Sequence, residues 1–174
     1  MPAAKAKESW NHLKDLHEIL RILEKDGRLT AAQVADMLGR PVEEIDAIIR
    51  QAEADGIIRR YKAVVHWDKA GDEKVFAFID VKVTPTRGFG FDDVAERIYR
   101  FPEVTAVYLV SGDHDLRVMV QGATMQEVAN FVYDKLATID RVQSTGTHFV
   151  LRRYKEDREI FAEGEEDHRL AVTL

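Results

Sequence analysis

The segment from Thr30 to Tyr61, TAAQVADMLGRPVEEIDAIIRQAEADGIIRRY, constrains the fold more than any other part of the chain. It predicts a short amphipathic helix, a tight turn, a second helix and a basic, strand-like exit. Thr30 followed by Gln33 is a capping-box pattern that opens the first helix, and Gly39 permits the left-handed backbone of the turn. This order of elements is typical of a winged helix-turn-helix, whose second helix enters the DNA major groove.

The flanking residues complete an N-terminal domain, which we place at residues 1–65. Apolar residues at helical spacing predict a preceding helix from Asn11 to Lys25, ended by Gly27. The sequence IIRRYKAVV is expected to begin a wing strand. The inward faces of the second and third helices are predicted to carry Val34, Met37, Leu38, Val42, Ile45, Ile48, Ile49 and Ala52.

A second domain is predicted at residues 75–154, after a polar linker at 66–74, and an acidic tail follows at 155–174. Its strands are expected at Val75–Val83, Val104–Val110, Asp115–Gly122 and Val142–Leu151, with helices at Phe91–Arg100 and Met125–Leu136. This order is βαββαβ, the ferredoxin-like arrangement. The fold class predicted for the chain is therefore α+β.

The first strand of this domain is apolar on both faces. Alternate residues from Val75 to Val83 should meet the two helices, which directs Phe76 and Phe78 to the face without helices. Met119 and Phe149 are expected to join them there. A sheet that is apolar on both faces needs a second cover, and a partner subunit is the simplest one, so we predict a dimer interface at Phe76, Phe78, Met119 and Phe149. The alternative is that the linker or the tail partly covers these aromatic side chains.

Composition limits the remaining functions. The chain has no cysteine and a formal charge of -6, so disulfides and thiolate metal sites are excluded and any DNA contact must come from a local basic patch. The six histidines show no metal-ligand spacing, so we expect no metal and no cofactor. No signal-peptide pattern and no apolar run near the ~20 residues of a membrane span is evident. We expect a cytoplasmic protein that does not bind membranes.

Three stretches resemble one known family: GIIRRYKAVV, FPEVTAVYLVSGDHDLRVMV and VQSTGTHFVLRRYK. They are similar to the Lrp/AsnC (feast/famine) transcription regulators, and the resemblance covers about residues 13–154. It implies an N-terminal winged helix-turn-helix, a βαββαβ ligand-sensing domain and double-stranded DNA as a partner. It also implies a homodimer, assembly of dimers into octamers, and a small effector, usually an amino acid, between sensing domains.

The reading helix departs from the pattern of this family. Family members usually carry Ser or Thr at its start and a basic run in its first half, but Pro41 stands at this start. From Pro41 to Asp55 there are five acids and one Arg. We expect weak, salt-sensitive affinity, although glutamate can accept hydrogen bonds from cytosine. The predicted DNA contacts are Arg28, Thr30, Arg40, Glu43, Glu44, Ala47, Arg50, Gln51, Arg59, Arg60 and Lys62.

The turn SGDHD links the two middle strands of the second domain. Gly112 and Asp113 are ordinary hairpin residues, so turn chemistry explains them without a ligand. The resemblance implies that this turn borders the effector pocket, where carboxylates and backbone N–H groups could hold an amino acid. The predicted effector contacts are Ser111, Gly112, Asp113, His114, Asp115, Thr145 and Thr147.

Three functions follow from these patterns. The first is a DNA-binding regulator that responds to a small metabolite. The second is an oligomeric sensor with little or no DNA affinity, because its reading helix is acidic. The third is an enzyme, since sirohaem decarboxylases resemble the same two-domain plan. The matching region TAVYLVSGDHDLRV carries aspartates where cations would hold a tetrapyrrole, so we expect no enzymatic activity.

Overall fold

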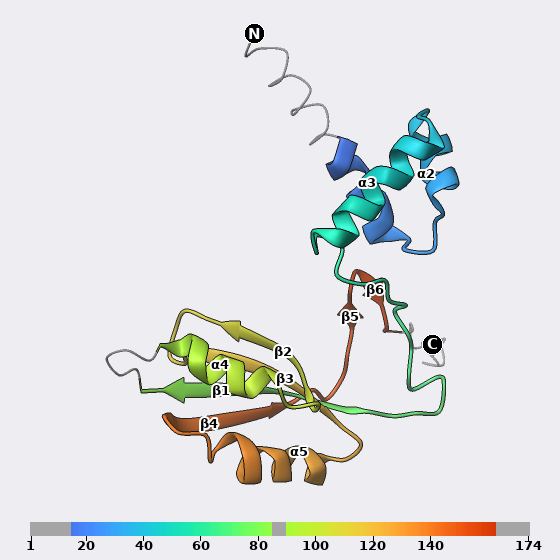
Figure 1. Cartoon of the computed structure of the whole chain (residues 1–174). Coiled ribbons are helices and arrows are strands. Elements are labelled where there is room, and N and C mark those ends of the chain that lie inside the picture. The colour runs from blue at the N-terminus through green and yellow to red at the C-terminus, as the bar shows by residue number, and fades with distance from the viewer. Residues whose placement is uncertain (1–14, 85–89, 163–174) are drawn as a thin grey trace, which may run out of the picture. The chain divides into compact units, whose positions relative to one another are not determined.

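A computed structural model describes residues 15–84 and 90–162 of the chain. These residues divide into two compact units, one ending at Val64 and the other beginning at Val65. In the first unit, a helix through residues 15–25 precedes α2 (Ala31–Leu38) and α3 (Val42–Ala54) (Figure 1). Residues 11–14 of the predicted first helix lie outside the described residues.

Local sequence signals set the ends of α2 as predicted. The Thr30 hydroxyl accepts the Gln33 N–H at 3.3 Å, and the Gln33 side chain accepts the Thr30 N–H at 2.9 Å. At the other end Gly39 has φ 63°, in the left-handed region where a side chain would be strained. The three helices then pack around a small apolar core, to which Ile19, Leu23, Val34, Ala35, Ile45 and Ile48 contribute.

Three predictions for this unit are wrong. Met37 is 61% exposed, because Ala35 takes the inward position of α2 and its small side chain lets the helices pack closely. Val42 is 40% exposed, since it is the first residue of α3 and the first turn of this helix extends beyond the core. The wing strand is absent: within residues 15–64 no second segment pairs with residues 57–64, and a strand needs a partner for its hydrogen bonds.

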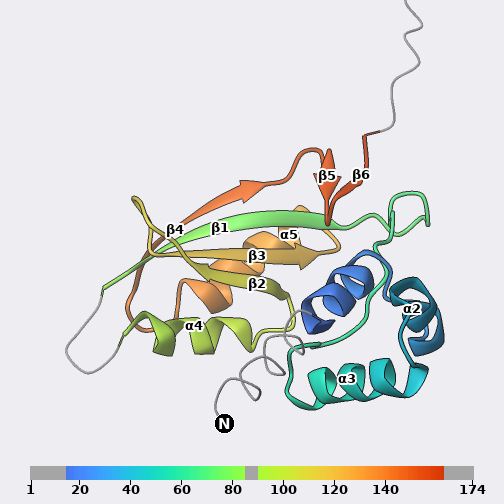
Figure 2. The same cartoon turned by 90° about the horizontal axis from the view of Figure 1, so that it is seen from above.

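The second unit contains an antiparallel sheet in the order β2-β3-β1-β4. These strands are β1 (Val75–Val83), β2 (Val104–Leu109), β3 (Leu116–Gly122) and β4 (Val142–Phe149). Helix α4 (Phe91–Tyr99) and helix α5 (Met125–Phe131), continued by the π-helical turn η1 (Val132–Leu136), pack on one face (Figures 1 and 2). The predicted βαββαβ order is therefore confirmed, with element ends shifted by one or two residues.

The core of this unit lies between the helices and one face of the sheet. Strand β1 presents Ala77, Ile79 and Val81 to this core, all with no exposed surface. The opposite face, which we call the open face, carries the intervening residues of β1. On it Phe78 stands opposite Met119, as predicted.

Phe149 was predicted on the open face, and this placement is wrong. It pairs with Ala77 across β1 and β4, so its side chain lies on the helix side, where it packs against the core. Its strand, VQSTGTHF, has too weak an alternation of apolar and polar residues to reveal which face is buried. Only the register of β4 with β1 determines on which face of the sheet Phe149 lies.

The chain beyond β4 also folds. Residues predicted as the start of an acidic tail form a hairpin of β5 (Lys155–Glu156) and β6 (Glu159–Ile160). The Arg153 guanidinium lies 5.2 Å from the ring centroid of Phe76 and 4.3 Å from that of Phe161. Phe76 is thus partly covered by its own chain, whereas Phe78 remains 36% exposed. Residues 163–174 of the predicted tail lie outside the described residues.

Candidate functional site

The predicted reading face of α3 is exposed and acidic. All of the predicted DNA contacts on α3 are exposed, namely Glu43, Glu44, Ala47, Arg50 and Gln51. Arg50, the one basic residue among them, forms an ion pair with Asp46, in which the Arg50 Nε lies 3.0 Å from the Asp46 Oδ2. Its charge is therefore compensated one helical turn away, and α3 by itself presents little positive potential to a phosphate backbone.

Arg40 in the turn before α3 is more strongly engaged. Its Nη1 lies 2.6 Å from Asp15 Oδ1 on the N-terminal helix, and its other nitrogens bind Glu44 in the first turn of α3. These hydrogen bonds raise the pKa of Arg40 above its ordinary value, and the bond to Asp15 contributes more than the bonds to Glu44. The guanidinium thus stays charged but is shared between two carboxylates.

Two further predicted contacts serve the local fold. The Thr30 hydroxyl caps α2, as described above, so it already accepts one hydrogen bond from the helix. Arg28 is exposed, and its backbone N–H donates to Asp26 Oδ1 at 2.9 Å in the preceding turn. The side chain of Arg28 remains positioned at the surface just before the helix-turn-helix.

The exit segment after α3 is held firmly although it forms no strand. The N–H groups of Ile57 and Ile58 both donate to the Ala52 carbonyl, at 2.9 and 3.0 Å, and Ile58 packs against the core. Farther along, the Tyr61 hydroxyl donates to Glu53 Oε1 at 2.9 Å, and its ring fits closely against Gly27. The two arginines between these anchors, at positions 59 and 60, are exposed.

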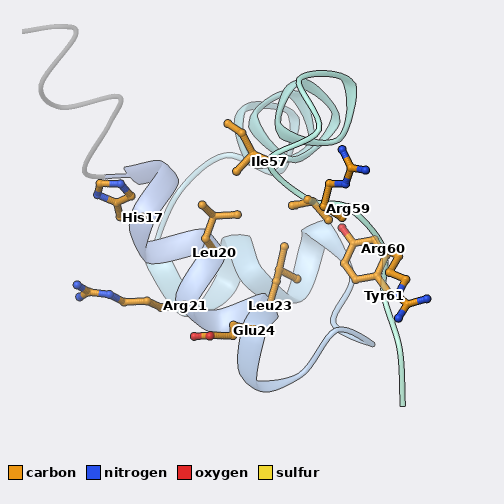
Figure 3. Close-up of a pocket in the computed structure, with 10 residues that line it drawn as sticks. His17, Leu20, Arg21, Leu23, Glu24, Ile57, Arg59, Arg60 and Tyr61 are labelled. Atoms are coloured by element: carbon orange, nitrogen blue, oxygen red, sulfur yellow. The ribbon is translucent and has the colours of Figure 1, made fainter. Parts of the chain in front are cut away.

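A groove of about 630 Å³ runs between this segment and the N-terminal helix (Figure 3). The segment from Ile57 to Tyr61 forms one wall and residues of the N-terminal helix form the other. Figure 3 shows Arg59 and Arg60 on the side opposite Arg21. Within the described residues neither Arg59 nor Arg60 forms an ion pair, so these side chains present uncompensated positive charge beside α3.

The predicted effector turn is tied to the end of β1. The Asp115 carboxylate accepts the Val83 N–H at 2.8 Å, and Lys82 Nζ donates to the Asp113 carbonyl at 2.8 Å. Gly112 has φ 130°, which few other residues adopt. Ser111 and Gly112 are exposed at the tip of the turn. The Asp115 carboxylate is thus already used by the fold.

The structure does not bring all of the predicted effector residues together. Thr145 pairs with Val81 and Thr147 with Ile79, so both threonines lie on the helix side of the sheet. His114 lies toward the open face instead, with Nδ1 3.9 Å from Asp80 Oδ2. Within one chain, these two groups of predicted contacts are separated by the thickness of the sheet.

Asp80 is a residue that the sequence interpretation missed. It is only 5% exposed although it lies on the open face, and Arg117 binds both of its oxygens, at 2.7 and 3.0 Å. The imidazole Nε2 of His148 lies 3.3 Å from Asp80 Oδ2. The signal available was an aspartate in the middle of a largely apolar strand, but its partners come from other strands and depend on register.

The pKa of Asp80 is lowered by the Arg117 hydrogen bonds, and also by the charges of Arg117, His114 and His148, against the opposing effect of burial. A lowered pKa in the folded state means that the ionised carboxylate stabilises the fold above its unfolded pKa, near 3.9, and that this contribution is lost as pH falls through the folded pKa.

Asp80→Asn is therefore expected to lower the free energy of unfolding at pH 7 by about 2 kcal/mol, because a charge-assisted pair is replaced by a weaker one. Urea denaturation at pH 7 and at several values below 4 would measure the difference. The wild type should approach the variant as pH falls below about 4, near the unfolded pKa. A difference that is unchanged at low pH would contradict this role of the carboxylate. Asp113→Asn, in the exposed turn, is the control.

Two negative findings apply to the described residues only. Across residues 15–84 and 90–162, no helix is long and apolar enough to cross a membrane. In the same part of the chain, no group of three or more His, Asp or Glu side chains is arranged to hold a metal ion.

Comparisons with known proteins match both units. Residues 16–59 match the winged helix-turn-helix DNA-binding model, and residues 76–160 match the Lrp/AsnC ligand binding domain. An uncharacterized HTH-type transcriptional regulator of Bacillus subtilis (strain 168), YugG, is 51% identical over 157 residues, which are 90% of this chain and 95% of that protein.

Solved structures agree on the fold. A transcriptional regulator from Neisseria meningitidis in complex with L-methionine superposes with a TM-score of 0.65 at 25% identity, covering 82% of this chain and 90% of that one. A feast or famine regulatory protein from M. tuberculosis, complexed with L-methionine, gives a TM-score of 0.69 at 24% identity, covering 84% and 97%. The predicted α+β fold class is confirmed, and the chain belongs to the Lrp/AsnC family of DNA-binding transcription regulators.

Proposed function

We propose that this regulator binds operator DNA through its N-terminal unit and holds phosphates chiefly with Arg59 and Arg60. The observation that carries the proposal is a pair of exposed arginines that form no ion pair with any described residue and that lie between two anchored residues directly after the reading helix. Phosphate neutralisation supplies most of the affinity of such domains, and base contacts from α3 add selectivity. Among the outward residues of α3, Gln51 and Arg50 are the best suited to base edges.

The test is fluorescence anisotropy with labelled DNA from upstream of the gene, compared with scrambled DNA of the same composition, across a salt series. Tighter binding to the upstream DNA with a steep salt slope supports the regulator. Equal and weak binding to both DNAs, which persists when amino acids are added, contradicts it.

The proposed effector is an amino acid bound at the turn from Ser111 to Asp115, with the binding site completed by neighbouring subunits. Two related structures are described as complexes with L-methionine, which supports this ligand class. The exposed tip of the turn, including Gly112, offers backbone N–H groups, and Asp113 offers a carboxylate for an ammonium group. Isothermal titration with L-methionine and a panel of other amino acids would test this. No heat change with any of them would argue against an amino-acid effector.

We further propose that the open face joins two copies of the chain, with Phe78 and Met119 at its centre. The two residues are directly opposite each other on neighbouring strands, and the helices cover only the other face. Dimers could then associate into octamers, as the family resemblance implies. A homodimer would also supply two reading helices to one operator.

A second candidate is a sensor with little DNA affinity. It is favoured by one specific observation, namely that Arg40 and Arg50, the two cations nearest the start and middle of the reading helix, are both paired with carboxylates. The anisotropy comparison distinguishes the two, because a sensor of this kind still binds its amino acid but shows no preference between the two DNAs.

A further inference from the structure

Arg40 lies where three elements of the N-terminal unit meet. It follows Gly39 in the turn between α2 and α3, it reaches Asp15 on the N-terminal helix, and it reaches Glu44 in the first turn of α3. Its side chain is 30% exposed, and that of Asp15 is 19% exposed. The pair is therefore partly shielded from water and less screened by salt than an ordinary surface pair.

All three nitrogens of the guanidinium contact the carboxylates of these two acids. Nε and Nη2 form a fork on the Glu44 carboxylate, and Nη1 binds Asp15. A fork of this geometry is also what a guanidinium offers to a phosphate. Arg40 cannot give the same fork to Glu44 and to DNA at once.

The local charge also opposes phosphate. One arginine and two carboxylates leave this corner of the helix-turn-helix with a net charge of about -1, taking Arg as always ionised and both acids as ionised at pH 7. Glu44 also stands in the first turn of α3, where the partial positive charge of the helix N-terminus attracts a carboxylate more than it attracts the Arg40 guanidinium. DNA that approaches the turn therefore meets a net negative charge at Asp15, Arg40 and Glu44 instead of a positive charge.

From these contacts, and given the DNA binding proposed above, we propose that Asp15 and Glu44 form a latch that withholds Arg40 from DNA and limits the affinity of this regulator. Asp15 lies outside the helix-turn-helix, so this role is not visible in the motif itself. Breaking the latch should release one additional phosphate contact.

The experiment compares the full-length wild type with Asp15→Asn/Glu44→Gln by fluorescence anisotropy on the upstream and scrambled DNAs. The matched control is Glu18→Gln/Asp36→Asn, which removes two exposed carboxylates from the N-terminal helix and α2; within the described residues, these two carboxylates form no ion pair. We expect the latch variant to bind about tenfold more tightly at low salt, with a salt slope steeper by about 1, and the control to change affinity less than twofold.

Arg40→Gln in both backgrounds tests whether the gain passes through Arg40. It should change the wild type less than threefold but abolish the gain of the latch variant. The latch is overturned if the latch variant gains no more than the control, or if the gain survives without Arg40. The single changes Asp15→Asn and Glu44→Gln, each checked by thermal melting, provide folded alternatives if the double variant is unstable.

The outcomes also separate this proposal from the regulator itself. Selective wild-type binding without a gain in the latch variant overturns the latch alone. A gain on both DNAs with no selectivity supports the latch and contradicts the operator-binding regulator. No binding by any variant overturns both, because a released Arg40 would then add nothing.

Discussion

Replacing Phe78 with aspartate is expected to convert the protein to a monomer, with the dimer dissociation constant raised at least about 100-fold. Phe78 projects from β1 on the open face, opposite Met119, and is the more exposed of the two phenylalanines there. In a dimer through this face, the introduced carboxylate would be buried in place of an aromatic ring, and its cross-strand neighbour His148 already lies against Asp80. The cost of that burial exceeds what the surrounding apolar contacts contribute.

Sedimentation velocity over a range of protein concentrations would measure this change. Tyr133→Asp is the matched control, because Tyr133 is a highly exposed aromatic residue on η1, which follows α5 on the other side of the sheet. A monomer for Phe78→Asp beside a dimer for both the wild type and the control supports the open face as the interface. Equal masses for all three proteins would show that the dimer, if present, uses another surface.

The second large effect is expected from Arg59→Glu/Arg60→Glu, which should weaken binding to the upstream DNA at least about 100-fold and lower the salt slope by about 2. Two phosphate-facing cations would be lost and two repelling anions gained. The segment should keep its position, because Tyr61 and the backbone bonds of Ile57 and Ile58 hold it without help from either arginine.

Anisotropy at three salt concentrations would measure both quantities. The control is Arg97→Glu/Arg100→Glu, on α4 and at its C-cap, which changes the net charge by the same amount in the other unit, at two exposed arginines. A comparable loss of affinity in both variants would mean that only total charge matters. Unchanged binding by Arg59→Glu/Arg60→Glu would show that the exit segment does not contact DNA.

These two experiments also bear on the acidic reading helix. If DNA binding depends on the exit segment and is limited by the pairing of Arg40, the acids on α3 restrain affinity but do not abolish it. Glu43 then remains available for base contacts, and Gln51 becomes available once its amide leaves the Asp55 carboxylate, to which Nε2 donates at 2.9 Å. If binding is absent at low salt, the sensor without DNA affinity becomes the better description of this chain.

Much of the architecture was predictable because it depends on neighbours in the sequence. The capping box of Thr30 with Gln33 and the left-handed turn at Gly39 are local features, and both are present as predicted. The alternation in β1 correctly placed Phe76 and Phe78 opposite the helix-covered face. The wing strand failed for the opposite reason, since a strand exists only with a partner and a single segment does not reveal one.

The chain by itself therefore determined the helix-turn-helix, the order βαββαβ and the family, all of which rest on periodicity, turn chemistry and motif. Only the tertiary structure decided that Phe149, Thr145 and Thr147 lie on the helix side, because strand register is a long-range property and one step exchanges the two faces. It also decided the partners of Asp80 and the pairing of Arg40 with Asp15, because these residues are distant along the chain. Charged side chains form pairs when the fold brings them close together, and the sequence alone does not give the distance between two such side chains.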